Sequence, residues 1–449
     1  MDENSFLRIF SKINIKKAFQ KCFILECLIF FYLLFMFKNI VHSETTYVSG
    51  RISFDTVWSA SCNPYIVTST IEIYGDTAAA VQLTIDTGVI IRFESGTGLR
   101  VGNGLNKGIL RAIGGSVEPE RIKWTANTGT PVRGYWGNII IDDGAADYDT
   151  LTGDGTVLEN CDIEYGGEYF SSDENIYIYN SSPGIKNCVI RESRANGIRL
   201  YETSNSLIEG NTITGNGAYG IYLLNSTPKP VITKNTITNN GNYPIRIYVT
   251  AINGLRLDNI YSMNSPDMVE VMGEIISEGY IKFSDTGIPY YINGNIELRY
   301  FRADTNVRME VGEGVEMRIK KDCGIGVGSH AWYMNTYPPE LKIKGTVSNP
   351  VKITSAEPVP GRGDWIGICF ENGNINGLSE IENCEIEYAG KSIYWGYPYY
   401  QTLWYGGITL IGGARVNMNG VKIRYSKQHG VYNAGGDLII DGAEIREND

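Results

Sequence analysis

The 449-residue sequence contains only three histidines, His42, His330 and His429, and none of its eight cysteines forms a Cys-x-x-Cys pair or a group with histidine. This scarcity argues against a structural zinc site, which needs four such ligands at short spacing. No Ser/His/Asp set and no phosphate-binding glycine loop stands out, and we expect His429 to be a turn residue rather than a base. Lys and Arg total 39 against 50 Asp and Glu, and the net charge of −11 argues against a nucleic-acid partner.

Long hydrophobic runs are also scarce. One stretch, residues 22–37, is apolar apart from Glu26, follows a basic segment and precedes small residues that end before Glu44. This pattern predicts a secretory signal peptide over residues 1–43. An uncleaved signal anchor is the alternative, although the run is shorter than the roughly 20 residues of a membrane span. In both cases we expect an exported chain, secreted or at the cell surface, with no other membrane span.

The abundant residues are those of strands and turns, with 52 glycines and 30 tyrosines. Asparagines recur every 24 to 27 residues, and an apolar residue follows each one closely. The pairs are Asn160 with Ile163, Asn187 with Ile190, Asn211 with Ile213, Asn235 with Ile237, and Asn259 with Ile260. A second series with the same step starts at Gly197, Gly220 and Pro244, where apolar and polar residues alternate. A fixed period of this length, with period-2 alternation, predicts short strands stacked as coils of an all-β parallel β-helix.

The asparagine column has two physical explanations. Asn tolerates the left-handed backbone of a sharp corner, and its side-chain amide can bond nearby backbone. Stacked Asn side chains can also hydrogen-bond one another along the stack. We therefore expect all five asparagines at one corner of successive coils.

A larger duplication divides the chain. GYWGNIII (134–141) recurs as GDWIGICF (363–370), and LENCDIEYGG (158–167) recurs as IENCEIEYAG (381–390). We predict two tandem modules, 44–264 and 265–449. The second module stops about two coils short of the first, so we expect either that another chain covers its last edge or that the sequence is the front part of a longer product.

These coils resemble the repeats of the right-handed, pectate-lyase-like β-helix superfamily, most closely over 134–260 and 363–449. That group includes pectate lyases, polygalacturonases, phage tailspikes and many surface proteins. The resemblance implies a right-handed parallel β-helix but says little about activity, because one fold hosts many functions. Polygalacturonase motifs are incomplete, since Asp142-Asp143 and Gln428-His429-Gly430 lack their partner motifs.

Acids and an arginine fall on successive predicted coils in each half. The first-half residues are Asp143, Glu164 and Arg191, and their second-half counterparts are Glu371, Glu387 and Arg424. The layout resembles that of pectate lyases, in which acids hold Ca²⁺ and an arginine takes the proton. The resemblance implies a Ca²⁺ role for the four acids and a catalytic role for the two arginines. Alternating charges that neutralise one another on an exposed sheet are the alternative.

A different predicted face carries tyrosine and arginine. Its outward positions read Arg199, Tyr222 and Arg246, with Tyr201 and Tyr248 on a neighbouring row. We expect no carboxylate there, which would exclude the pair of acids that a glycosidase needs. Tyrosine and arginine suit sugar rings and hydroxyls, and a solvated face with cross-strand pairs is the alternative.

The second half also has an aromatic insert between Cys384 and Val421 that contains Trp395 and Trp404. It could form a platform for sugar chains, or a loop that folds back over the stack. Cys161 and Cys188 occupy the same place in successive coils, so either a disulfide or two plain core cysteines would fit.

Taken together, these patterns predict an exported β-helix protein that binds a polysaccharide or cell-surface glycan without catalysis, or serves as a surface scaffold. The alternative is a Ca²⁺-assisted lyase that acts on an acidic polysaccharide.

Overall fold

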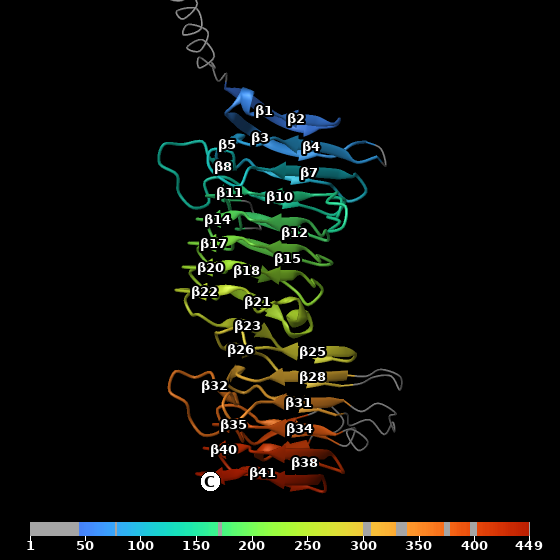
Figure 1. Ribbon diagram of the computed structural model, residues 1–449, viewed down its shortest axis with the longest axis vertical. Coiled ribbons are helices and arrows are strands. Elements are labelled where there is room, and N and C mark those ends of the chain that lie inside the picture. Colours follow the sequence, from blue (N-terminus) through green and yellow to red (C-terminus); the bar gives the residue numbers. More distant parts are fainter. Residues whose placement is uncertain are drawn as a thin grey trace, which may run out of the picture.

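A computed structural model describes residues 45–448, apart from the stretches 77–78, 169–172, 300–306, 329–338, 372–377 and 396–401. Short strands stack as successive coils along one long axis (Figure 1). The predicted signal peptide lies outside the described residues. The helices of the described chain are the 3₁₀ turns η1 (Ala60–Cys62) and η2 (Val249–Gly254), and neither has the length or apolar character needed to cross a membrane.

In the first half, strands pair in parallel within three columns. Column A holds β5 (Ile90–Phe93), β8 (Ile122–Ala126), β11 (Cys161–Glu164), β14 (Val189–Arg191), β17 (Thr212–Thr214), β20 (Thr236–Thr238) and β22 (Ile260–Ser262). Column B holds β6 (Leu99–Val101), β9 (Ile139–Ile141), β12 (Ile176–Tyr179), β15 (Ile198–Tyr201), β18 (Ile221–Leu223), β21 (Ile245–Tyr248) and β23 (Val269–Met272). Column C holds β2 (Thr56–Trp58), β4 (Val81–Ile85), β7 (Gly108–Ile113), β10 (Val157–Glu159), β13 (Gly184–Lys186), β16 (Leu207–Glu209) and β19 (Val231–Thr233). The long strand β3 (Tyr65–Ile73) begins both columns A and B and pairs with β1 (Thr46–Ile52).

The second half continues column B and adds two new columns. Column B goes on through β26 (Tyr290–Asn293), β29 (Glu316–Ile319), β32 (Val351–Ser355), β35 (Cys384–Glu387), β40 (Lys422–Arg424) and β43 (Glu444–Arg446). Column D holds β24 (Ile275–Ile276), β27 (Ile296–Leu298), β30 (Ile325–Val327), β33 (Ile368–Phe370), β38 (Gly406–Ile411) and β41 (His429–Ala434). Column E holds β25 (Gly279–Phe283), β28 (Val307–Gly312), β31 (Glu340–Lys344), β34 (Ser379–Glu382), β39 (Arg415–Asn419) and β42 (Asp437–Asp441). The strands β36 (Ile393–Trp395) and β37 (Thr402–Trp404) form a separate antiparallel hairpin.

The core is a stack of inward side chains, as predicted. Ile163, Ile190, Ile213 and Ile237 pair in register on successive coils of column A and are fully buried. The next residue in register is Tyr261, so the prediction of Ile260 is wrong. Ile260 points outward and is 62% exposed, because strand alternation puts the inward residue two positions after Asn259.

The asparagines occupy two neighbouring positions, not one. Asn160 and Asn187 sit at the corner with φ of 53° and 51°. Asn211, Asn235 and Asn259 come one residue later in the coil and point inward. The Asn211 Nδ2 donates to Asn235 Oδ1 at 2.9 Å, and the Asn235 Nδ2 donates to Asn259 Oδ1 at 3.0 Å. Left-handed corners and a side-chain ladder therefore both occur, at adjacent positions.

The cysteines precede this ladder in the same inward position. Cys161 and Cys188 are buried and free, so the structure has the core arrangement rather than the disulfide. Burial raises the pKa of the Cys161 thiol well above its usual value. A second buried ladder, which the sequence analysis did not predict, runs through Asn216, Asn240 and Asn264.

The two halves are joined by continuous strand pairing. β23 pairs with β21 on one side and with β26 on the other, so column B passes the predicted boundary at residue 265, while column A ends at β22. By the sequence duplication, β29, β32, β35 and β40 correspond to β5, β8, β11 and β14. The second-half copies of column A therefore lie in column B. The module boundary itself stays a prediction.

We expect Asn235→Ala to lower the free energy of unfolding by about 2–3 kcal/mol, because the buried N–H groups of Asn211 lose their acceptor. Asn235 is fully buried, and both the backbone N–H and the side-chain amide of Asn211 donate to it. The urea midpoint with an unchanged m-value measures the loss. Thr236→Ala, on the outer face of the next position, is the control and should stay within about 0.5 kcal/mol. Equal shifts for both variants would contradict a structural role for the ladder.

Candidate functional site

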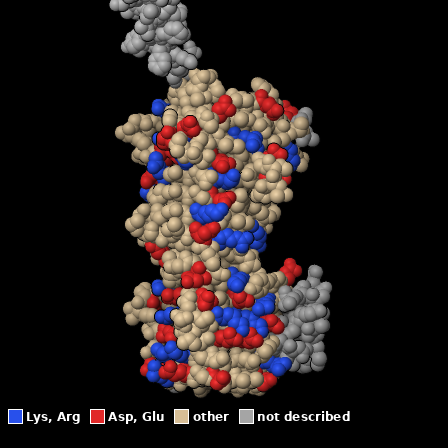
Figure 2. Space-filling model, in the orientation of Figure 1, with Lys and Arg blue, Asp and Glu red and all other residues tan. Residues whose placement is uncertain are grey.

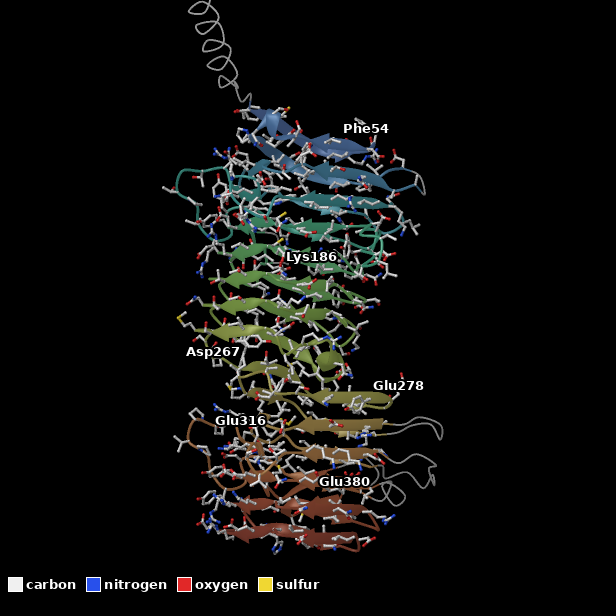
Figure 3. The ribbon with its side chains drawn as sticks, viewed as in Figure 1. Phe54, Lys186, Asp267, Glu278, Glu316 and Glu380 are labelled. Atoms are coloured by element: carbon white, nitrogen blue, oxygen red, sulfur yellow. The ribbon has the colours of Figure 1, made fainter. Side chains whose placement is uncertain are left out.

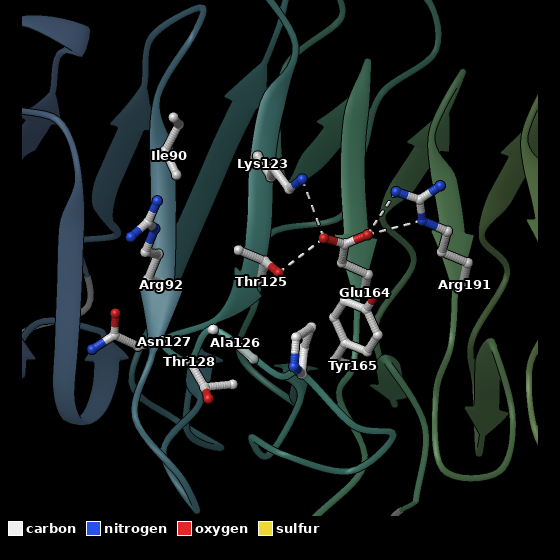
Figure 4. Close-up of a pocket in the computed structure, with 12 residues that line it drawn as sticks. Ile90, Arg92, Lys123, Thr125, Ala126, Asn127, Thr128, Glu164, Tyr165 and Arg191 are labelled. Atoms are coloured by element: carbon white, nitrogen blue, oxygen red, sulfur yellow. Dashed lines mark hydrogen bonds and ion pairs between the residues drawn. The ribbon is translucent and has the colours of Figure 1, made fainter.

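A cleft of ≈850 Å³ lies on column A, where β5, β8, β11 and β14 meet the loop that follows β8 (Figure 4). Its lining residues are Ile90, Arg92, Lys123, Thr125, Ala126, Asn127, Thr128, Gly129, Pro131, Glu164, Tyr165 and Arg191. Strand alternation explains the composition of its floor. Ile91, Trp124 and Ile163 are buried inside the coil, and the residues beside them point outward.

Four outward residues stand in register on consecutive coils of this floor. Arg92 pairs with Thr125, Thr125 lies beside Glu164, and Glu164 pairs with Arg191. Neighbouring strands are about 4.8 Å apart, so each side chain reaches the next.

Glu164 is the centre of this group. Its carboxylate accepts hydrogen bonds from the Arg191 Nε at 2.9 Å and from the Thr125 Oγ1 at 2.9 Å, and the Lys123 Nζ lies 3.3 Å away. Burial alone would raise the pKa of Glu164. The hydrogen bonds from Arg191 and Thr125 and the charges of Lys123 and Arg191 outweigh burial and hold that pKa below its usual value. Glu164 therefore stays ionised and fixes both cations at the cleft floor.

A buried indole fixes the backbone of Glu164. Trp136 is fully buried, stacks on Phe93 with ring centroids 4.2 Å apart, and donates its Nε1–H to the Glu164 carbonyl at 2.8 Å. The residue after Glu164, Tyr165, has a φ of 68° that turns the chain sharply out of the strand. The loop between Trp124 and Trp136 thus closes one side of the cleft.

Arg92 is the cation of the cleft for which the described residues provide no partner. It is exposed and forms no hydrogen bond or ion pair with any residue that the structure describes. With Lys123 and Arg191 it gives the cleft three cationic side chains against the single carboxylate of Glu164. The residues that line the cleft therefore carry a net positive charge, on a protein whose net charge is −11.

The predicted tyrosine and arginine face lies on column B. Arg199, Tyr222 and Arg246 stand in register on successive coils. The Arg246 guanidinium lies over the Tyr222 ring, 4.7 Å from its centroid, and donates to the Tyr222 hydroxyl at 2.7 Å. On the neighbouring row, Tyr201 lies 5.5 Å from the ring of Tyr179. Tyr248, also on that row, donates its hydroxyl to the Leu224 carbonyl at 3.0 Å.

The expectation that this face holds no carboxylate is wrong. Glu270 follows Arg246 in register, is buried, and accepts a hydrogen bond from the Tyr219 hydroxyl at 2.9 Å. Glu174, which is also buried, lies 3.8 Å from Arg199, and its burial raises its pKa to about 7 against the opposing charge of Arg199. Glu174 lies in a corner before β12 and Glu270 beyond the last regular repeat, so the repeat did not reveal them.

These two acids contact different arginines of the row. Glu174 lies 3.8 Å from Arg199, and Glu270 lies 3.9 Å from Arg246. Arg199 and Arg246 are two coils apart, so each acid pairs with its own arginine.

The four acids proposed for Ca²⁺ do not converge. Asp143 follows β9 of column B, whereas Glu164 lies on column A. Glu371 is buried after β33 and pairs with Arg299, and Glu387 lies on β35. Within the described part of the chain, no three His, Cys, Asp or Glu residues gather where they could hold a metal ion.

The remaining predicted residues are placed as follows. Arg424 pairs in register with Glu387, as Arg191 does with Glu164. Trp395 and Trp404 end the two strands of the β36–β37 hairpin, and their side chains lie outside the described residues. Figure 2 shows Lys and Arg beside Asp and Glu at several places along the visible face, which fits the predicted alternative of mutual neutralisation.

Sequence reasoning found Glu164 and Arg191 but missed Arg92, Lys123 and Thr125. Two signals were available in the sequence. Apolar and polar residues alternate around residues 90–93 and 122–126, and the pattern Lys123-x-Thr125 recurs as Lys352-x-Thr354, 229 residues later. The spacing between these early coils is irregular, which hid their register.

Glu164→Gln should flatten the dependence of stability on pH at acidic values. The pKa of Glu164 is lower in the folded than in the unfolded protein. Its contribution to the free energy of unfolding is therefore present above the unfolded pKa of about 4.3 and is lost as the pH falls through the folded pKa. Urea unfolding between about pH 5 and pH 3 should therefore show a steeper loss for the wild type than for Glu164→Gln. Glu120→Gln, at an exposed acid without an ion pair among the described residues, is the control. Parallel curves for wild type and Glu164→Gln would exclude the network as described.

The match to a family model agrees with the fold. Residues 136–295 match the family model described as right handed beta helix region. No curated protein matches the chain. Among solved structures, the catalytic domain of a GH87 alpha-1,3-glucanase in complex with tetrasaccharides is similar, with 12% identity and a TM-score of 0.27. The match covers 89% of this chain and 64% of that one, so the chain spans less than two thirds of its length. Together, the parallel columns and the family match over residues 136–295 show that the fold is a right-handed parallel β-helix.

Proposed function

We propose that the protein is an exported, non-catalytic β-helix protein that binds an acidic polysaccharide in the cleft of column A. The observation that carries this proposal is the unpartnered Arg92 beside Lys123 and Arg191, in a cleft whose single carboxylate is already engaged. A uronate carboxylate accepts the two parallel hydrogen bonds that a guanidinium offers.

The other lining groups suit a sugar. Thr125, Asn127 and Thr128 supply hydroxyl and amide groups, and the half-buried ring of Tyr165 supplies an apolar surface. Binding sites of this kind combine a few placed polar groups with aromatic surface. The cleft opens on a regular column of strands, so a chain can extend beyond it along the solenoid axis.

The same contacts argue against a lyase. Burial lowers the pKa of Arg191, but the hydrogen bond and charge of Glu164 more than compensate and raise it above its usual value. A base at this position must give up its proton easily, and Arg191 is held in the protonated form. Glu164 is likewise occupied by three donors, which leaves it little capacity to bind Ca²⁺.

Arg92→Ala should weaken the binding of a short oligogalacturonate about ten- to a hundredfold, because one charge-assisted contact is worth about 1.5–3 kcal/mol. Titration calorimetry at low and high salt measures the affinity, which should fall as salt screens the cleft. Arg51→Ala is the matched control, since Arg51 is paired with Asp76 far from the cleft. If both variants bind like the wild type, the cleft is not the binding site.

The protein should release no unsaturated sugar ends from polygalacturonate in the presence of Ca²⁺, because Arg191 stays protonated. Absorbance near ~235 nm, followed across a range of pH, detects such ends. A rise that disappears in Arg191→Lys would instead establish the lyase.

A further inference from the structure

The second half repeats the framework of the cleft residue by residue. The loop from β8 to β9 and the loop from β32 to β33 have equal length, and each contains a fully buried tryptophan. Trp365 donates its Nε1–H to the Glu387 carbonyl at 2.8 Å, as Trp136 does to Glu164. The corresponding residues are Arg92 and Arg318, Lys123 and Lys352, Thr125 and Thr354, Glu164 and Glu387, Tyr165 and Tyr388, and Arg191 and Arg424.

The charge of the copy is different. Where the first site has Ile90, the second has Glu316, and its carboxylate pairs with the Arg318 Nε at 2.7 Å. Glu316 lies on the outer surface, beside the loop of the second half (Figure 3). In the loop, Thr128 corresponds to Glu357, since each comes six residues after the start of its strand. The cation left unpartnered in the first site is therefore neutralised in the second.

The central contact is also rearranged. Glu387 lies 3.6 Å from the Lys352 Nζ and accepts a long hydrogen bond of 3.5 Å from Thr354. Arg424 faces Glu444 instead, at 4.0 Å, and its buried Nε has no acceptor in the described structure. The tight pair of Glu164 and Arg191 thus has no equivalent here.

An aromatic pair takes the place of a charge. The residue after Arg191 is Glu192, which pairs with Arg133, whereas the residue after Arg424 is Tyr425. Tyr425 stacks on Tyr388 with ring centroids 5.1 Å apart and planes 18° apart, and both rings are half-exposed. Two parallel rings with hydroxyl groups form a surface that packs against the face of a sugar ring and hydrogen-bonds its hydroxyls.

We infer that this surface, formed by Arg318, Lys352, Glu387, Arg424 and the Tyr388–Tyr425 pair, is a second saccharide site that takes uncharged sugar residues. The inference extends the proposed function, since the first site supplies the framework from which the second differs. Glu316 and Glu357 repel a uronate carboxylate at the second site, and the tyrosine pair replaces charge recognition by stacking.

The test uses two probes of equal length, an oligogalacturonate and its fully methyl-esterified form, with the whole chain and titration calorimetry. Tyr388→Ala/Tyr425→Ala should weaken binding of the methyl ester about tenfold and leave the acid form unchanged. The control is Tyr148→Ala/Tyr280→Ala, which removes two tyrosine rings that lie on Lys186 of column C and Arg308 of column E, outside both sites. Glu316→Ile/Glu357→Thr should raise the number of oligogalacturonate molecules bound per protein chain from about one to about two.

The two proposals fail separately. If the tyrosine variant binds the methyl ester like the wild type, or the glutamate variant keeps a single acid-form equivalent, the second site is refuted while the first stands. If Arg92→Ala binds the oligogalacturonate like the wild type, the first site is refuted. In that case, a loss of methyl-ester binding in Tyr388→Ala/Tyr425→Ala still supports the second site. Unfolding temperatures that match the wild type confirm that each variant folds.

Discussion

The vertical stacking of alternate side chains is the constraint on which this structure depends. Each strand turns every second residue inward, and parallel pairing places that residue on its equivalent one coil away. Once Ile163, Ile190, Ile213 and Ile237 are stacked, the outward residues next to them on each strand are also fixed in register. Arg92, Thr125, Glu164 and Arg191 form a row for this reason, although up to 39 residues separate neighbours in sequence.

The same constraint explains what the sequence could reveal. Where the coils are regular, from Asn187 to Asn259, the period predicted the columns and the core to within one residue. The errors came from counting whole repeats rather than inward positions: Ile260 was chosen over Tyr261, and corner and ladder asparagines were merged. The step from Arg92 to Thr125 is 33 residues and the next is 39, so a period near 24 could not align them.

Side chains from outside the strands escaped prediction for a different reason. Glu174 is part of a corner and Trp136 of a loop, and their contacts depend on how those segments fold back over the coil. No periodicity encodes that path. Glu164 and Arg191 were identified with two alternatives, either a metal ligand with a base or two charges that neutralise each other, and the structure shows the ion pair. The chemistry of an ionisable residue depends on its neighbours, and in a solenoid the nearest neighbours are a full coil away in sequence.

The duplicated strands, which lie in column A in the first half and column B in the second, place two similar surfaces at a fixed distance along the solenoid axis. In Figure 1 the loops that follow β8 and β32 project from the same side of the stack. The strand pairings place Thr354 eight coils beyond Thr125, which is about 38 Å along the axis. A polymer held at one of these positions would present its distant units to the other at a high effective concentration. Retention of a long chain would then exceed that of its fragments, with no added contact at either position.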